Sequence, residues 1–170
     1  VRSSFANQGQ ICLCGSRIFV ERKIYSKFKS DFVAKVAALK VGDPSKADTN
    51  IGALVSKEHL EKVQSYIALT EGGGGTILSG GNRVTVKAME QGYYLEPTII
   101  EVTSNNCKLN QEEIFGPVVT IMPFDTEEEA IAMANDVKYG LSATLWTSNI
   151  NRTMRVSKEI EAGIVWVNTW

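Results

Sequence analysis

Strand-like and helix-like segments alternate along almost the whole chain, and this alternation restricts the fold more than any other feature. The β-rich runs occupy residues 16–21, 76–79, 98–102, 118–124, 142–146 and 164–167. From residue 118 onward the order is strand, helix, strand, helix, strand, which is the connectivity of parallel strands joined by right-handed crossovers. The sequence therefore predicts an α/β domain with an open, twisted, largely parallel sheet and helices on both faces.

The first long helix is predicted after residue 21, where apolar residues recur at helical spacing. Its inner face is expected to carry Ile24, Phe28, Phe32, Val36 and Leu39. The Gly-Asp-Pro run at 42–44 should end it.

Three more helices follow from start signals and spacing. One should begin at Ser56 and turn Leu60, Val63 and Ile67 inward. On its outer side Glu58 stands four residues before Lys62, the spacing of a helical ion pair. Another should begin where Thr126 and Glu129 form a capping box, and the last is expected near 150–161.

Composition excludes several classes of function. The 170 residues, 44% of them hydrophobic, suit one soluble domain. The balance of 18 basic against 19 acidic residues gives no broad positive field for nucleic acid or anionic lipid. No apolar run reaches the roughly 18 residues of a membrane span, and no leader pattern opens the chain. We expect no nucleic acid and no membrane partner, and a cytoplasmic location with a mitochondrial one left open.

The stretch N-Q-G-Q-I-C-L-C-G-S at 7–16 holds the densest group of chemistry-bearing residues. Gly9 stands just before Gln10 and Cys12, so the backbone can turn sharply and bring a thiol and backbone N–H groups to one small volume. A nucleophile and an oxyanion donor need that proximity. Residue types alone favour an inert, buried cysteine over a nucleophile, because free cysteine is among the most buried side chains.

The three cysteines do not form a disulfide framework, because their number is odd and their spacing irregular. This favours a reducing compartment and a working thiol. The C-x-C spacing of Cys12 and Cys14 also suggests a metal or redox pair, but the second Cys or His pair of a zinc site is missing. We expect no metal, and Cys107 in a polar loop is interpreted as incidental.

Two blocks of this sequence resemble the aldehyde dehydrogenase superfamily. The stretch at 7–16 resembles its active-site cysteine motif, and E-E-I-F-G-P-V at 112–118 resembles the segment beside the nicotinamide half of the cofactor. Further stretches agree in order at 52–55, 92–98, 139–143 and 163–168. The resemblance implies that Cys12, not Cys14, attacks the aldehyde carbonyl. It also implies that Glu113 accepts hydrogen bonds from the nicotinamide ribose and that Phe115 packs beside the ring.

The resemblance extends to weaker site candidates. His59 and Lys62 lie on a helix that can touch the nucleotide, although His59, between Glu58 and Glu61, is expected to face solvent and is rejected as general base. The glycine runs at 72–75 and 80–81 match no phosphate-binding motif and are interpreted as turns. The apolar substrate tunnel would be lined by Ala6, Ile11, Leu13 and Trp170.

What the family places elsewhere limits the function of these residues alone. The dinucleotide-binding domain, the general-base glutamate, the oxyanion asparagine and the C-terminal oligomerisation strand all fall outside residues 1–170. We therefore expect one catalytic domain from a longer, homo-oligomeric enzyme, inactive as an isolated fragment. NAD is the expected cofactor, with NADP left open, and a small aldehyde is the expected partner.

The I-C-L-C form at 11–14 resembles the subgroup that acts on muconic and 2-aminomuconic semialdehydes. Two other classes remain as alternatives. One is a non-catalytic structural relative of the crystallin kind, and the other is a cysteine esterase or hydrolase that works without NAD. The presence of Cys12, Glu113 and Phe115 argues against the first.

Overall fold

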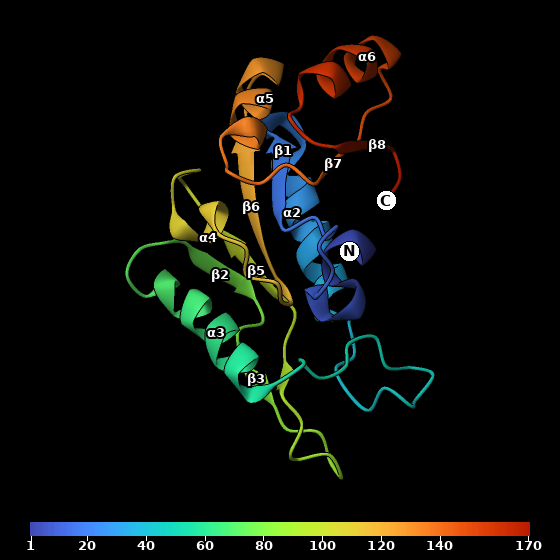
Figure 1. The fold of residues 1–170 in the computed structure, drawn as a ribbon, viewed down its shortest axis with the longest axis vertical. Helices are drawn as coiled ribbons and strands as arrows, with labels where there is room; N and C mark the ends of the chain where they lie inside the picture. Colours follow the sequence, from blue (N-terminus) through green and yellow to red (C-terminus); the bar gives the residue numbers. More distant parts are fainter.

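The computed structural model describes residues 1–170, and Figure 1 shows its helices and strands. The helical elements, in chain order, are α1 (Arg2–Phe5), η1 (Ala6–Gly9), α2 (Arg22–Ala37), α3 (Lys57–Ile67), η2 (Ala68–Thr70), α4 (Lys108–Gln111), α5 (Glu127–Asn135) and α6 (Ile150–Glu159). The strands are β1 (Arg17–Glu21), β2 (Thr76–Ser79), β3 (Arg83–Val84), β4 (Tyr94–Leu95), β5 (Thr98–Glu101), β6 (Val118–Phe124), β7 (Ser142–Leu145) and β8 (Ile164–Val167).

Four strands form the main sheet in the order β1-β6-β5-β2. The central strand β6 runs parallel to both β1 and β5, and only the edge strand β2 is antiparallel. The predicted α/β class and largely parallel sheet are confirmed. Four strands lie outside the main sheet. β7 and β8 form a separate parallel pair, and β3 and β4 form a short antiparallel pair that was not predicted from the sequence.

Helices cover both faces of this sheet, as predicted (Figure 1). Successive strand residues point to opposite faces, so Ile99 and Ile100 of β5, both 0% exposed, enter different cores. One core joins the sheet to α1 and α2: Phe5, Val20, Tyr25, Phe32, Val36, Ile51, Ile99, Val119 and Ile121. The other joins it to α3 and α4: Leu54, Leu60, Val63, Ile67, Leu95, Ile100, Val102, Leu109, Ile114 and Val118.

The predicted inner face of α2 was wrong at its first position. Ile24 is 57% exposed, and Tyr25 is buried in its place. At 3.6 residues per turn, Ile24 lies about 120° around the helix from Val36, whereas Tyr25 lies about 20° from it. The helix ends at Ala37, so Leu39 lies beyond it and packs against the same core.

Helix α3 follows its prediction closely. The Ser56 hydroxyl accepts a hydrogen bond from the His59 N–H, and Leu60, Val63 and Ile67 are buried. The outer ion pair differs, because Lys57 rather than Lys62 pairs along the helix, with 3.6 Å between its Nζ and Oε1 of Glu61.

The capping box of α5 is present in a shifted form. Thr126 Oγ1 accepts from the Glu129 N–H at 3.1 Å, but the Glu129 carboxylate accepts from the N–H of Asp125, one residue before the cap. Both bonds satisfy N–H groups at the start of the helix, which is the purpose of the motif.

Candidate active site

The residues before Cys12 form a left-handed turn, which we call the nucleophile turn (residues 7–12). Asn7, Gln8 and Gly9 have φ angles of 48°, 58° and 69°. Each left-handed L-residue costs about 1–2 kcal/mol, although Asn tolerates this region better than most. Two local hydrogen bonds close the turn: the Gln10 N–H donates to Asn7 O at 3.0 Å, and Asn7 Nδ2 donates to Gln10 O at 3.1 Å. Cys12, at the end of this turn, is exposed to solvent.

Two glycines bring the cysteine motif and the E-E-I-F-G-P-V segment into direct contact. A Cβ atom on Gly9 would lie 2.1 Å from the carbonyl oxygen of Gly116. A Cβ atom on Gly116 would lie 2.6 Å from Cγ2 of Val63, a fully buried residue of α3. Only glycine permits both approaches. The nucleophile turn therefore rests on the second motif, which rests on α3.

The nucleophile turn is also joined to the loop of residues 52–55. The Gln8 amide makes two bonds there: its Oε1 accepts from the Gly52 N–H at 3.2 Å, and its Nε2 donates to Ala53 O at 3.4 Å. Gln10 Oε1 accepts from the Val55 N–H at 3.1 Å. Sequence reasoning missed these contacts, because only the fold brings residues 45 positions apart together.

Of the two thiols in the motif, Cys12 is exposed and Cys14 is half-buried. The Cys14 Sγ lies 3.9 Å from Ala6 O, and burial raises the pKa of the Cys14 thiol above its ordinary value. A raised pKa leaves less thiolate at neutral pH, and thiolate is the reactive form. Cys107 packs against the core under α3. Cys12 is thus the thiol that a substrate can reach.

Helix α3 holds the segment of residues 113–115 through its backbone. Lys62 Nζ donates to Glu113 O at 3.2 Å, and His59 Nε2 lies 2.7 Å from Phe115 O. A carbonyl oxygen only accepts, so Nε2 must carry the proton. The expectation that His59 faces solvent is wrong, because the residue is half-buried and its Nε2 is bonded to Phe115 O.

The side chains of Glu113 and Phe115 are exposed. Phe115 has a φ of 61° and meets the His59 ring edge-on, with 6.4 Å between ring centroids. The neighbouring Glu112 is used differently, because its Oε2 accepts from the Tyr66 hydroxyl at 2.6 Å. That hydrogen bond raises the pKa of Tyr66 to about 12. Of the two glutamates, only Glu113 leaves its carboxylate free for a ligand.

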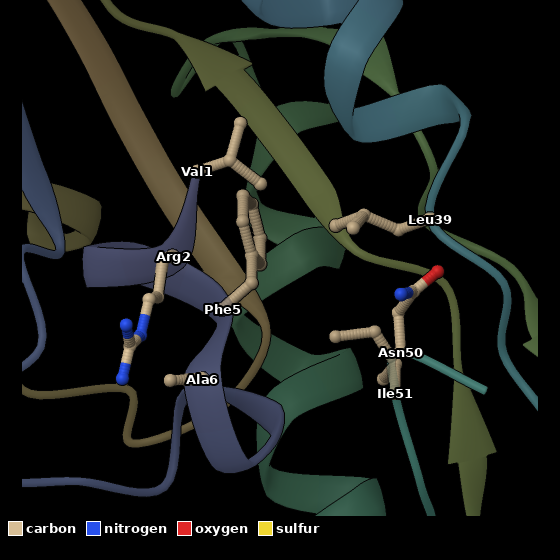
Figure 2. Close-up of a pocket in the computed structure, with 7 residues that line it drawn as sticks. All are labelled: Val1, Arg2, Phe5, Ala6, Leu39, Asn50 and Ile51. Carbon is tan, nitrogen blue, oxygen red and sulfur yellow. The ribbon is translucent and has the colours of Figure 1, made fainter. Parts of the chain in front are cut away.

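The predicted substrate residues are only partly brought together. Trp170 Nε1 donates to Leu13 O at 2.9 Å, so the last residue lies against the nucleophile loop. Ile11 is half-buried beside them. Figure 2 shows a pocket of about 330 Å³ that Ala6 borders, with Val1, Arg2, Phe5, Leu39, Asn50 and Ile51. Its lining does not include Cys12, so it is not the predicted tunnel.

Two further observations concern membrane-spanning helices and metal-binding groups. No helix has the length and apolar character to cross a membrane. The structure holds no group of three or more His, Cys, Asp or Glu side chains with metal-binding geometry.

Several known proteins resemble this chain over its whole length. The sequence model of the aldehyde dehydrogenase family matches residues 1–170. Human 2-aminomuconic semialdehyde dehydrogenase is 52% identical over 174 residues, which span 100% of this chain and 36% of that protein. A 2-aminomuconic 6-semialdehyde dehydrogenase from a Pseudomonas species is 44% identical over 171 residues, spanning 100% of this chain and 35% of that protein.

A solved structure is also similar to this chain in fold. Betaine aldehyde dehydrogenase from Staphylococcus aureus, in complex with NAD+, superposes with a TM-score of 0.96 at 37% identity. The match covers 99% of this chain and 34% of the crystallised one. The chain spans roughly a third of the length of the relatives it matches.

Proposed function

Because this chain belongs to the aldehyde dehydrogenase family, we propose that it supplies the nucleophile-bearing catalytic domain of an enzyme that oxidises an aldehyde to a carboxylic acid. The observation that carries the proposal is the exposed Cys12 on a strained turn that packs against Gly116, the residue next to the 113–115 segment. One motif offers a reactive thiol and the other offers groups suited to a nicotinamide cofactor. The chain covers a third of its relatives, so the remaining functional groups would come from a longer protein.

Cys12 begins the reaction as a thiolate. Its sulfur forms a bond to the aldehyde carbon while the carbonyl π electrons move to oxygen, giving a thiohemiacetal oxyanion. The Cys12 backbone N–H makes no hydrogen bond within the chain, so it is free to donate to that oxyanion. Hydride leaves the tetrahedral carbon with its electron pair, and the carbonyl re-forms as a thioester. Water then adds to the thioester carbon and the C–S bond breaks, releasing the carboxylic acid and the Cys12 thiol, which gives its proton to solvent to return to the thiolate.

The residues of the 113–115 segment fit the nicotinamide end of NAD. The Glu113 carboxylate is an acceptor-only group suited to a ribose diol, and the exposed Phe115 ring suits the face or edge of a planar ring. Bound NAD+ would supply the hydride acceptor. Lys62 and His59 hold the backbone of this segment in place, which sets where the Glu113 and Phe115 side chains stand.

For the substrate, we propose a semialdehyde of the 2-aminomuconate class. The support is the similarity to enzymes of that name at 52% and 44% identity, together with the I-C-L-C form around the nucleophile. Half-buried Ile11 and Leu13 flank the thiol and would give the aldehyde an apolar approach.

The isolated domain should not turn over. Its general base, its second oxyanion donor and the phosphate-binding part of the cofactor site are expected outside residues 1–170. We propose that the 170 residues alone neither oxidise aldehydes nor bind NAD+ with micromolar affinity. Calorimetric titration with NAD+ is the direct check, and micromolar binding would show that the cofactor site is more self-contained than proposed.

A substrate panel with the full-length enzyme tests the proposal as a whole. The panel should contain 2-aminomuconic semialdehyde, betaine aldehyde and a simple aliphatic aldehyde, each with NAD+ and with NADP+. We expect NADH formation that disappears when Cys12 is alkylated. Ester hydrolysis without any dinucleotide-dependent oxidation would instead support a cysteine hydrolase. The absence of both activities would support a non-catalytic structural relative.

A further inference from the structure

The Gln8 side chain occupies an unusual place, because it is the inner link between the nucleophile turn and the rest of the domain. Its amide bonds the Gly52 N–H and Ala53 O at the same time, so it pairs with that loop as a strand backbone would. An added Cβ at Gly52 would lie 3.6 Å from the Gln8 Cδ, which shows that the amide lies flat against the loop. The Gln10 contact to Val55 lies farther out, at an exposed position.

Gln8 is needed because the turn has little other support. Left-handed residues do not continue a strand or a right-handed helix, and the bond from the Gln10 N–H to Asn7 O closes on the turn itself. Gly9 contributes close packing against Gly116. Side-chain amides are therefore what fix the direction in which the turn presents Cys12.

The loop that receives Gln8 is a rigid platform. Ile51 and Leu54 on either side of the contact are 2% and 4% exposed, and the Leu54 N–H donates to Tyr93 O at 2.9 Å. Two residues later Ser56 caps α3, the helix that holds the 113–115 segment. One continuous stretch thus supports both the thiol and the proposed cofactor-binding side chains.

We infer that Gln8 is a positioning residue for the reaction, one that fixes Cys12 relative to the 113–115 segment through its paired hydrogen bonds to Gly52 and Ala53. Gln8 touches neither aldehyde nor cofactor in this assignment. It acts by keeping the sulfur within reach of a carbonyl carbon that also faces the nicotinamide. The inference rests on the proposed function for its kinetic consequence and on the structure alone for its effect on the thiol.

The test compares Gln8→Ala and Gln8→Glu in the full-length enzyme with a matched control, Asn135→Ala. Asn135 makes the same kind of paired contact, donating to Glu159 O at 2.7 Å and accepting from the Glu161 N–H at 2.9 Å, but in the region of α5 and α6. Gln8→Glu keeps the shape and the acceptor while losing the donor to Ala53. The readouts are kcat and KM for aldehyde and NAD+, the thermal midpoint, and the ratio of Cys12 to Cys14 labelling by iodoacetamide.

We expect kcat to fall about tenfold to a hundredfold in Gln8→Ala with both KM values within about twofold, because misplacement of a reacting atom slows chemistry more than binding. Gln8→Glu should show a smaller loss in kcat, and both variants should change the labelling ratio. Asn135→Ala should lower the thermal midpoint similarly while leaving kcat and the ratio unchanged. Unchanged kcat and labelling in both Gln8 variants, or the same kinetic loss in the control, would overturn the inference. If Gln8→Ala does not fold, the kcat and the labelling ratio of Gln8→Glu decide whether the inference holds.

The labelling arm requires no turnover, which separates the two proposals. An enzyme that shows no dinucleotide-dependent oxidation refutes the proposed function, yet its Cys12 to Cys14 ratio still tests the role of Gln8.

Discussion

The nucleophile turn with its supports and the C-terminal β7–α6–β8 region are held to the sheet by different forces. The turn rests on apolar burial and glycine contacts: Val63 and Ile114 behind it are 0% and 4% exposed. In the C-terminal region the large apolar side chains remain exposed, with Trp146 at 65%, Ile150 at 71% and Met154 at 54%. Its two strands pair with each other and not with the main sheet.

Polar contacts take the place of apolar ones in the C-terminal region. Glu127 of α5 accepts from Arg152 and from Arg155 of α6, and the Asn135 amide bonds two backbone groups at the end of α6, Glu159 O and the Glu161 N–H. Exposed ion pairs contribute little, commonly 0–1 kcal/mol. The difference teaches that the geometry around Cys12 is set by close packing together with the Gln8 side-chain hydrogen bonds in the first region. Changes in the second region should therefore alter the site far less than equal changes in the first.

The largest expected effect separates the thiols within the first region. Cys12→Ala should lower kcat by more than about a thousandfold, the scale seen when a covalent nucleophile is removed. Cys14→Ala should retain most activity, because that thiol is half-buried with a raised pKa. Steady-state NADH formation by the two full-length variants measures both. Comparable losses would show that the motif, rather than Cys12, carries the chemistry.

A pair of glycines compares the packing of the two regions directly. Gly9→Ala should destabilise the fold by about 1–3 kcal/mol or more, since φ is 69° and the new Cβ would lie 2.1 Å from Gly116 O. Gly163→Ala in the C-terminal region should cost within about 0.5 kcal/mol, because its nearest atom is Leu141 O at 3.5 Å. Urea unfolding of both variants gives the two free energies. Similar values would mean that the two regions are packed equally tightly.

Much of the fold could be predicted from the sequence, and the failures have physical causes. The buried face of α3 and the bounds of β6 followed from periodicity alone, because one strong amphipathic or β-branched pattern specifies them. The inner face of α2 failed at Ile24, since an apolar residue at its start was taken as part of the stripe although rotation along the helix carries it to solvent.

The candidate site divides in the same way. Its motifs predict roles for Cys12, Glu113 and Phe115, but the left-handed turn at residues 7–9 has no periodic signal. The Gln8 contacts join residues 44 and 45 positions apart. Contacts of that range depend on how the sheet brings loops together. The separation of β7 and β8 from the main sheet also depends on tertiary pairing, because parallel connectivity alone does not say which strands become neighbours.

A smaller effect on the rate of hydride transfer is expected from single glutamate substitutions, one in each region. Glu113→Gln should slow hydride transfer about tenfold, because a neutral amide accepts from a ribose diol less well than a carboxylate does. Glu127→Gln removes the negative charge that pairs with both Arg152 and Arg155 in the C-terminal region and should leave hydride transfer within about twofold. Single-turnover measurements with bound aldehyde isolate this step. An unchanged rate in Glu113→Gln would remove that residue from the cofactor site.

The smallest effect concerns the contact that joins the two regions at the end of the chain. Trp170 donates from Nε1 to Leu13 O at 2.9 Å, so Trp170→Phe keeps the apolar ring and removes the hydrogen bond. The expected loss is about 0.5–1.5 kcal/mol in the free energy of unfolding, the usual net value of one such bond. Because Leu13 follows Cys12 directly, kcat should also change slightly, by less than about threefold. Urea unfolding and steady-state kinetics measure the two quantities. A stability loss well above this range would mean that the C-terminal region is firmly coupled to the nucleophile loop, and the contrast between a tightly packed site and a loosely attached neighbour would be wrong.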